Sequence, residues 1–308
     1  MDKVLDLQGI ITVLNTPFTR DNLIDVEALK QNVQRAIDAG VVGFLVPAMA
    51  SEVSKLSLVE RREIIEAVLE IAQGTVIVIG GASALNNEEC IKIAKDVIDL
   101  GCDGVLINIP YKNDMQYTRS VEKIANLDPG FLMLQDWSFE GYGIPIDLIV
   151  SLFDQIEVFK ALKVEVVPSG VKYSQVLEST NRKLHVSGGW AVMQMIEALD
   201  RGVHAFMPTG MHWIYTEIIK LYKKNRESAK KLFNELLPVL AFSNQHLDIS
   251  VHFYKRLLFA QGIYNTPIVR EPILKFDAVH EKMANEHIEH VKKLETRIIN
   301  TRKTNQNM

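Results

Sequence analysis

Three short stretches of the sequence share one layout: Gly-Val-Val-Gly-Phe-Leu at residues 40–45, Gly-Cys-Asp-Gly-Val-Leu at residues 101–106 and Gly-Val-His-Ala-Phe-Met at residues 202–207. In each stretch a glycine follows a helix-like segment and leads into an apolar run. Glycine is favoured directly after a helix because that position often needs a positive φ. The repeat therefore predicts the same unit at three points of the chain, a helix followed by a buried strand.

Apolar runs alternate with amphipathic helical patterns over the first 225 residues. Continuous apolar strands separated by helices are typical of a parallel sheet covered by helices, and eight such units favour a closed (β/α)₈ TIM barrel over an open sheet. The expected strands are residues 9–14, 42–46, 76–80, 104–107, 131–134, 156–160, 184–187 and 205–207. The expected helices are residues 25–39, 57–72, 87–100, 145–153, 166–179, 190–201 and 212–223.

The strand pattern stops after Asn225. Residues 226–240, 250–261 and 275–299 have helical patterns without intervening strands. We therefore expect an α/β fold with two regions, a (β/α)₈ barrel at residues 1–225 and a C-terminal helical region at residues 226–308.

The composition excludes several classes of protein. Of the 308 residues, 47% are hydrophobic and 23% are charged, which is the balance of a globular protein with a large core. The net charge of −4 favours neither a nucleic-acid nor a membrane partner. The two cysteines, Cys90 and Cys102, cannot form a disulfide framework, and no Cys/His spacing is typical of a metal site. No signal segment is evident at the start, so a cytoplasmic protein is expected.

Lys160 is the first candidate for chemistry, because it ends the run Ile-Glu-Val-Phe-Lys at residues 156–160. A lysine at the carboxyl end of a barrel strand points into the mouth of the barrel, where active sites lie. Partial desolvation favours loss of its proton, and a neutral amine can attack a ketone to form a Schiff base. The alternative is a strand-end lysine whose amine reaches water.

Six segments of the chain, in order, resemble the dihydrodipicolinate synthase / N-acetylneuraminate lyase family of Schiff-base-forming pyruvate aldolases and dehydratases. Residues 9–18 resemble its strand that runs into a Thr-Pro-Phe loop, and residues 51–61 resemble its Gly-Glu…Leu-Ser…Glu-Arg stretch. The other matches are Pro-Tyr-Lys-Asn at residues 110–113, Phe159-Lys160 to the Ile-Lys pair that holds the Schiff-base lysine, Ser187-Gly188 to a Ser-Gly-Asp turn, and residues 266–272 to a Gly-Pro-Val-Arg-x-Pro segment.

The resemblance implies that Lys160 condenses with the ketone of pyruvate or another 2-keto acid, so that a C–C bond can break or form, or water can leave. Gln135 aligns with the family's proton-relay tyrosine. The candidates for replacing that tyrosine are Tyr111, Lys112, Tyr142, Asp136 and a bound water, and the sequence does not choose among them. The implied substrate-binding residues are Thr16, Met49, Ala50, Ser51, Lys112, Ser187, Gly188 and Thr209. The implied partner is a small-molecule keto acid with no metal or cofactor, and the implied assembly is a homo-oligomer, either a dimer or a tetramer.

Three departures from the family pattern bear on the substrate. The turn after the second strand has Met49 and Ala50 where the family has hydroxyl residues, and Lys112 and Gln135 stand where it has tyrosines. A carboxamide donates and accepts hydrogen bonds but does not titrate. We therefore expect a Schiff-base lyase of unassigned substrate. Two alternatives stay open, 4-hydroxy-tetrahydrodipicolinate synthase activity itself and a non-catalytic barrel that binds a keto acid.

Other residues receive structural interpretations. Glu52 is expected to order the turn after the second strand rather than to act as a base. Lys163 and Lys172 are expected on or before the surface of the helix at residues 166–179. The Ser-Gly-Gly turn at residues 187–189 is interpreted as the entry to a helix, with a phosphate cradle as the alternative.

Overall fold

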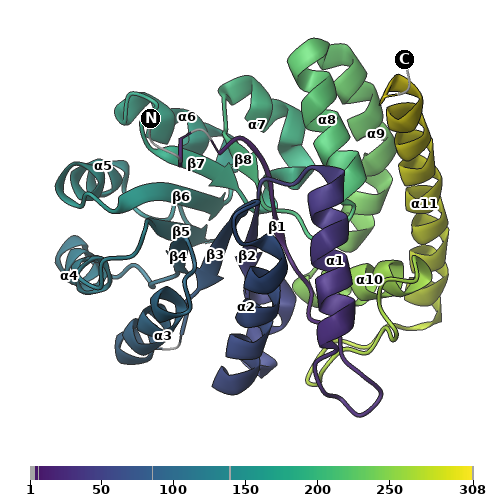
Figure 1. Cartoon of the computed structure of the whole chain (residues 1–308). Coiled ribbons are helices and arrows are strands. Elements are labelled where there is room, and N and C mark those ends of the chain that lie inside the picture. Colours follow the sequence, from purple (N-terminus) through teal and green to yellow (C-terminus); the bar gives the residue numbers. More distant parts are fainter. Residues whose placement is uncertain (1–3, 6, 85, 139, 307–308) are drawn as a thin grey trace. The chain divides into compact units, whose positions relative to one another are not determined.

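The computed structural model describes residues 4–5, 7–84, 86–138 and 140–306. Within these residues, parallel strands close into an eight-stranded barrel in the order β1 to β8 (Figure 1), which confirms the predicted TIM-barrel fold class. The strands are β1 (Gly9–Val13), β2 (Gly43–Val46), β3 (Ile77–Gly81), β4 (Gly104–Ile107), β5 (Leu132–Ser138), β6 (Phe159–Val166), β7 (His185–Gly188) and β8 (Ala205–Phe206).

The chain forms two compact units. The first, called the barrel unit, comprises Met1–Ile11, Val42–Val46 and Gln73–Pro208, and it holds most of the strands. The second, called the helical unit, comprises Thr12–Val41, Pro47–Ala72 and Thr209–Met308. Two N-terminal helices thus group with the C-terminal ones. These units do not test whether a barrel domain ends and a helical domain begins at Asn225, so that boundary stays a prediction.

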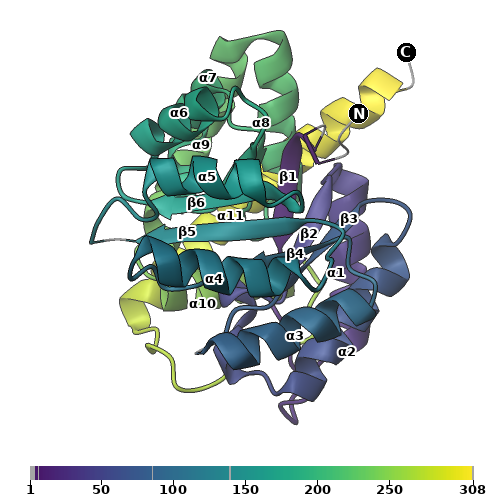
Figure 2. The same cartoon turned by 90° about the vertical axis from the view of Figure 1, so that its left-hand side faces the viewer.

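Helices surround the strands of the barrel unit, and Figure 2 shows α4 and α5 lying beside β5 and β6. Asparagine side chains begin two of these helices: Asn86 accepts from the Glu89 amide at 2.9 Å, and Asn113 from the Gln116 amide at 3.0 Å. The helices are α3 (Asn87–Asp99), α4 (Asp114–Ala125), α5 (Ile146–Gln155), α6 (Ser169–Ser179), the 3₁₀ turn η3 (Trp190–Gln194) and α7 (Met195–Arg201).

The glycines that open the three repeated stretches have the predicted conformation. Gly40, Gly101 and Gly202 have φ of 95°, 91° and 89°, and each directly follows a helix or its final turn. L-residues with side chains rarely adopt this left-handed region, so glycine is the residue that ends the helix without strain. The repeat therefore predicted both the end of each helix and the strand that follows it.

The predicted bounds of the sixth strand are wrong. Ile156 instead caps helix α5, with its amide donating to the Leu152 carbonyl at 2.9 Å, and the Phe159 amide turns back to the Ile156 carbonyl at 3.0 Å. Strand β6 begins only at Phe159 and continues to Val166. Lys160 is therefore its second residue, near the amino end of the strand rather than at its carboxyl end.

The helical unit contains the predicted C-terminal helices, and Figure 1 shows α8, α9 and α11 side by side. Residues 57–60 form a capping box at the start of α2, because the Ser57 amide donates to the Glu60 carboxylate at 2.8 Å while the Glu60 amide donates to the Ser57 hydroxyl at 3.2 Å. The elements are α1 (Val26–Ala39), η1 (Met49–Ser51), η2 (Val53–Lys55), α2 (Leu58–Ala72), α8 (His212–Lys224), α9 (Arg226–Ser243), α10 (Leu247–Ala260) and α11 (Ala278–Gln306).

None of the helices in the described part of the chain combines the length and apolar character needed to span a membrane.

Candidate active site

A lysine is buried within strand β6, and it is not the predicted one. Lys163 lies in the second half of the strand and is only 5% exposed, whereas Lys160 is half-buried near the strand's amino end. In a barrel the carboxyl half of each strand leads to the active-site face. The expected surface position of Lys163 is therefore wrong, and its amine lies where the sequence analysis placed that of Lys160.

Strand alternation shows which way Lys163 points. Asp136 of β5 pairs in register with Val164, and its carboxylate reaches Lys172 on helix α6, outside the barrel. Successive side chains of a strand point to opposite faces. Gln135 and Lys163, which are also in register with each other, therefore face the barrel interior.

Glu165 shares this inner face with Lys163. One carboxylate oxygen, Oε2, lies 3.3 Å from Lys163 Nζ and also accepts a hydrogen bond from Gln135 Nε2. All three side chains are buried. A carboxylate and an amine are therefore held in direct contact inside the barrel, with a carboxamide donating to the carboxylate.

The turn after β7 closes one side of this cluster. Ser187 pairs in register with Lys163 and Gly188 with Val164, and the Ser187 hydroxyl lies 3.5 Å from the Leu162 carbonyl. A Cβ on Gly189 would lie 2.0 Å from Glu165 Oε1. The carboxylate thus occupies the space that a phosphate in this turn would need, which argues against the phosphate-cradle alternative.

The loop after β5 is held by a second buried ion pair. Lys172 Nζ lies 3.1 Å from Asp136 Oδ2 and donates to the Tyr142 carbonyl at 2.7 Å and to the Ile144 carbonyl. Asp136 Oδ1 accepts from the Ile144 amide at 2.8 Å. Burial raises the pKa of Asp136, opposed by the Lys172 charge, and burial lowers the pKa of Lys172. Lys172 is therefore a buried residue that anchors a loop, and its expected surface position is wrong.

Tyr111 and Lys112 differ from the buried residues Gln135, Lys163 and Glu165 in their exposure to solvent. Both are exposed, and the Tyr111 hydroxyl donates to Asp114 at the start of α4 at 2.7 Å. This hydrogen bond raises the pKa of Tyr111. Lys112 lines a cavity of about 560 Å³ together with Asn87 and Gln116. The catalytic role of Tyr111 and the substrate-binding role of Lys112 stay predictions.

The remaining predicted site residues belong to the helical unit. Thr16 donates to the Ser51 carbonyl at 2.7 Å, and the Ser51 hydroxyl donates to the Leu14 carbonyl at 2.6 Å. These bonds join the loops that follow β1 and β2. Met49, which is 42% exposed, and Ala50 begin the short helix η1, while Thr209 is buried. The structure brings Thr16 and Ser51 together, and the substrate contacts of these residues stay predictions.

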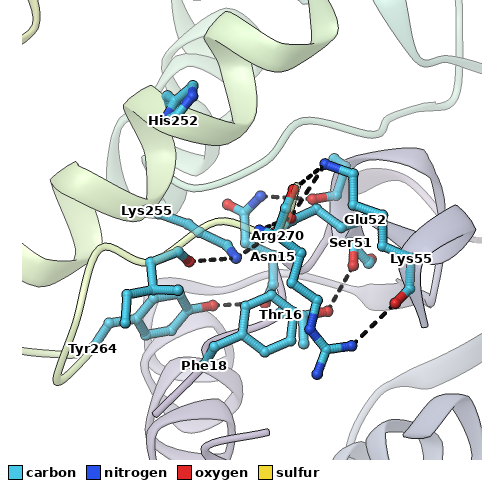
Figure 3. A network of polar contacts seen from close by, with 12 residues as sticks. Asn15, Thr16, Phe18, Ser51, Glu52, Lys55, His252, Lys255, Tyr264 and Arg270 are labelled. Atoms are coloured by element: carbon cyan, nitrogen blue, oxygen red, sulfur yellow. Dashed lines mark hydrogen bonds and ion pairs between the residues drawn. The ribbon is translucent and has the colours of Figure 1, made fainter. Parts of the chain in front are cut away.

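Glu52 orders this pair of loops, as expected (Figure 3). It is buried with a φ of 59°, accepts from the Arg270 amide at 2.8 Å and pairs with Lys255, whose side chain is fully buried in helix α10. Burial lowers the pKa of Lys255 to about 8, opposed by the charge of Glu52. Lys55 lies farther from the Glu52 carboxylate, at 3.7 Å.

The segment after α10 completes the network. Lys255 Nζ and the Arg270 guanidinium each lie 4.1 Å from the centre of the Phe18 ring, a cation–π arrangement. The Tyr264 hydroxyl donates to the Asn15 carbonyl at 2.7 Å. The C-terminal region therefore fixes the loops after β1 and β2, which contain several predicted substrate-binding residues.

Metal-binding and thiol chemistry receive no structural support among the described residues. There, no group of three or more His, Cys, Asp or Glu side chains is arranged to hold a metal ion. Cys90 and Cys102 are free and buried, and burial raises the pKa of their thiols to about 11 and about 12. Both pack in the core.

Sequence reasoning missed Lys163 and Glu165, although a signal was present. Two apolar–lysine pairs lie three residues apart, Phe159-Lys160 and Leu162-Lys163, and either one resembles an Ile-Lys pair. Lys163 and Glu165 also have the two-residue spacing of one strand face. Recognising that spacing would have favoured Leu162-Lys163.

The closed barrel, with a lysine and a carboxylate in contact on the inner face of β6, has the architecture of the (β/α)₈ barrel enzymes. Within that class, the chain belongs to the dihydrodipicolinate synthetase family, because residues 6–291 match the family model. The predicted family and the predicted enzyme class, a class I lyase, are confirmed.

One sequence relative agrees with this assignment, and solved structures share the fold. A 4-hydroxy-tetrahydrodipicolinate synthase of Methanosarcina mazei is 30% identical over 292 residues, covering 91% of this chain and 97% of its own. A dihydrodipicolinate synthase structure from Rhodopseudomonas palustris superimposes with a TM-score of 0.85 at 20% identity, covering 93% of this chain and 98% of its own. A chloride-inhibited synthase from Acinetobacter baumannii, complexed with pyruvate, gives a TM-score of 0.83 at 20% identity, covering 93% and 99%.

Proposed function

We propose that this protein is a Schiff-base-forming lyase that acts on pyruvate or another 2-keto acid through the amine of Lys163. The observation that carries the proposal is the position of this side chain, buried on the inner face of β6 and in register with Gln135 and Ser187. The pyruvate complex of the Acinetobacter baumannii relative supports the choice of ligand class. Lys160 had been predicted for this role, and its place at the amino end of β6 favours Lys163 instead.

The chemistry follows from the amine. Lys163 attacks the keto carbon, water leaves, and the protonated imine draws electrons from the adjacent carbon. A carbon–carbon bond beside that carbon can then break or form, or water can be eliminated from it. The imine itself accepts the electron pair, so the proposal requires no added cofactor.

The family resemblance implies which backbone amides would bind the substrate carboxylate. Backbone amides at the start of η1, at Met49 and Ala50, remain the predicted carboxylate donors. Support comes from the fixed position of this turn, since Asn15 Nδ2 donates to the Ala50 carbonyl at 2.7 Å. A homo-oligomer, dimer or tetramer, remains the expected assembly.

The reaction class is broader than that of the named relatives. Gln135 stands where the family pattern has a relay tyrosine, and the structure gives it the Glu165 carboxylate as a partner. A site rearranged in this way favours a different acceptor or substrate over 4-hydroxy-tetrahydrodipicolinate synthesis. Synthase activity proper is the second candidate, favoured by the name of the Methanosarcina mazei relative.

Borohydride trapping tests the proposal. The full-length protein is incubated with pyruvate and a panel of 2-keto acids, reduced with borohydride, digested and analysed by mass spectrometry. We expect a reduced adduct at Lys163 in the wild type and in Lys160→Ala, and none in Lys163→Ala. An adduct at Lys160, or binding of keto acids without any adduct, would overturn the assignment, and the second result would favour a non-catalytic binding barrel.

A further inference from the structure

Lys163 carries the proposed reacting amine. Among the contacts that the structure gives for this amine, the nearest carboxylate is that of Glu165. Its Oε2 atom lies 3.3 Å from Lys163 Nζ, close enough to exchange a proton with a group bonded to that nitrogen. Two features hold the carboxylate beside the amine: Lys163 and Glu165 both lie on strand β6, and Gln135 donates a hydrogen bond to Glu165.

Gln135 cannot perform the proton transfers itself, because a carboxamide does not titrate. Its amide group donates to Glu165, which keeps the carboxylate beside the lysine. Gln135 is thus a positioning residue, and the acid–base capacity lies one strand away on Glu165.

The glycine after β7 is explained by the same carboxylate. Gly189 has a φ of −84°, which any residue can adopt, so backbone conformation does not require glycine there. A Cβ at this position would instead lie 2.0 Å from Glu165 Oε1 and 2.6 Å from Lys163 Cε. Both functional side chains occupy the space that the absent Cβ leaves open.

We propose that Glu165 is the general acid and base of this enzyme, in the role that the missing relay tyrosine would have. The inference rests on the proposed function at Lys163. After Lys163 attacks the keto carbon, protonated Glu165 gives its proton to the carbinolamine hydroxyl. The C–O bond breaks, water leaves, and the iminium forms beside the resulting carboxylate.

The carboxylate then acts as the base. It removes a proton from the carbon next to the iminium, and the electron pair moves to nitrogen to give the enamine. In the cleavage direction it removes the proton of the substrate hydroxyl instead. The carbon–carbon bond breaks, an aldehyde leaves, and the electrons again reach the nitrogen. Glu165 then protonates the enamine carbon, and its carboxylate takes a proton from the water that hydrolyses the iminium. The keto acid leaves, Lys163 is freed as the amine, and Glu165 is again protonated.

Lys163 and Tyr173 are titratable groups that interact with this carboxylate. Lys163 faces it from its own strand, Gln135 is neutral, and the turn at Gly189 adds no charge. From helix α6, the buried phenol of Tyr173 is near enough for the Glu165 charge to contribute to raising its pKa, mainly raised by burial.

Hydrogen exchange at the methyl group of pyruvate measures the base step without knowledge of the natural acceptor. In deuterium oxide, exchange requires both the imine and a base, and NMR follows the loss of the methyl signal. We expect Glu165→Gln to slow exchange at least about 100-fold, the contribution typical of a general base. Borohydride should still trap pyruvate at Lys163 in this variant after long incubation.

Two further variants separate catalysis from packing. Glu165→Asp keeps a carboxylate and should recover part of the exchange rate, whereas Gly189→Ala should slow exchange by displacing the carboxylate. Glu178→Gln, on the exposed face of α6, is the matched control and should exchange like the wild type.

The outcomes distinguish this inference from the proposed function. Trapping at Lys163 with unchanged exchange in Glu165→Gln would overturn the role of Glu165 and leave the Schiff-base assignment standing. Equal pH profiles of exchange in the wild type and in Glu165→Gln would do the same. No trapping by pyruvate or any panel keto acid in the wild type would instead overturn the proposed function, and this inference with it.

Discussion

Replacing Lys255 by methionine removes one partner of the buried ion pair that organises the loops after β1 and β2. The side chains of Lys255 and Glu52 are 0% and 2% exposed, so the substitution leaves a carboxylate that water cannot reach. Breaking a buried pair in this way costs about 3–5 kcal/mol of the free energy of unfolding. Because Glu52 keeps the Arg270 amide at 2.8 Å and Lys55 at 3.7 Å, we expect the lower end of this range.

A double-mutant cycle isolates the pair from the packing of its side chains. Glu52→Gln alone leaves the ammonium of Lys255 buried without its carboxylate and should also destabilise the protein by about 3 kcal/mol. In the double variant no unpaired charge remains, and the introduced carboxamide can still accept from the Arg270 amide. The double variant should therefore be more stable than either single variant.

Urea unfolding, followed by circular dichroism and tryptophan fluorescence, measures these free energies. The control is Lys95→Met, which breaks the exposed Lys95–Asp99 pair on helix α3 and should change stability by no more than about 0.5 kcal/mol. The reasoning is refuted if Lys255→Met lowers the free energy of unfolding by less than about 1 kcal/mol. It is also refuted if the decrease in the double variant equals the sum of the decreases in the two single variants.

Three further changes test other parts of the structure. His212 is buried, and burial lowers its pKa to about 3. As the pH falls, this histidine is therefore protonated in the unfolded chain before it is protonated in the folded protein. The free energy of unfolding should fall by up to about 1.4 kcal/mol per pH unit below about pH 6.5. His212→Gln, unfolded in urea at pH 7 and pH 4, should show a smaller loss, and an unchanged loss would exclude this residue as the cause. Lys172→Met leaves Asp136 buried without its partner and frees the loop carbonyls, so it should cost about 3–5 kcal/mol and expose the loop to limited proteolysis; wild-type resistance would contradict this. Gly101→Ala forces a side chain into a φ of 91° and should cost about 1–2 kcal/mol in urea unfolding, against little change for Gly141→Ala.

Much of the fold could be predicted because its signals are local. A glycine after a helix, such as Gly101, and a capping box, such as that of Ser57 and Glu60, act through a few neighbouring backbone groups. These interactions do not depend on the rest of the protein. The predicted strands that follow such glycines are therefore close to the observed ones.

The site was harder to predict because its strands contain charges. Buried parallel strands usually read as apolar runs, so Lys163 and Glu165 concealed the second half of β6, and the apolar residues before it were taken for the strand. Gln135 and Asp136 likewise extend β5 beyond its predicted end. Glu165, Gln135 and Asp136 each have a partner that is distant in sequence, and no local pattern reports such a partner.

The network around Phe18 has a consequence for how the protein is made. The loop after β1 is synthesised well before Tyr264 and Arg270, which hold it in the folded protein. Because a chain grows from its N-terminus, this loop has no anchor while the nascent chain is still short of those residues. Final ordering of the loop therefore waits until those residues have been synthesised, and a chain cut short before Tyr264 would lack the support of that loop.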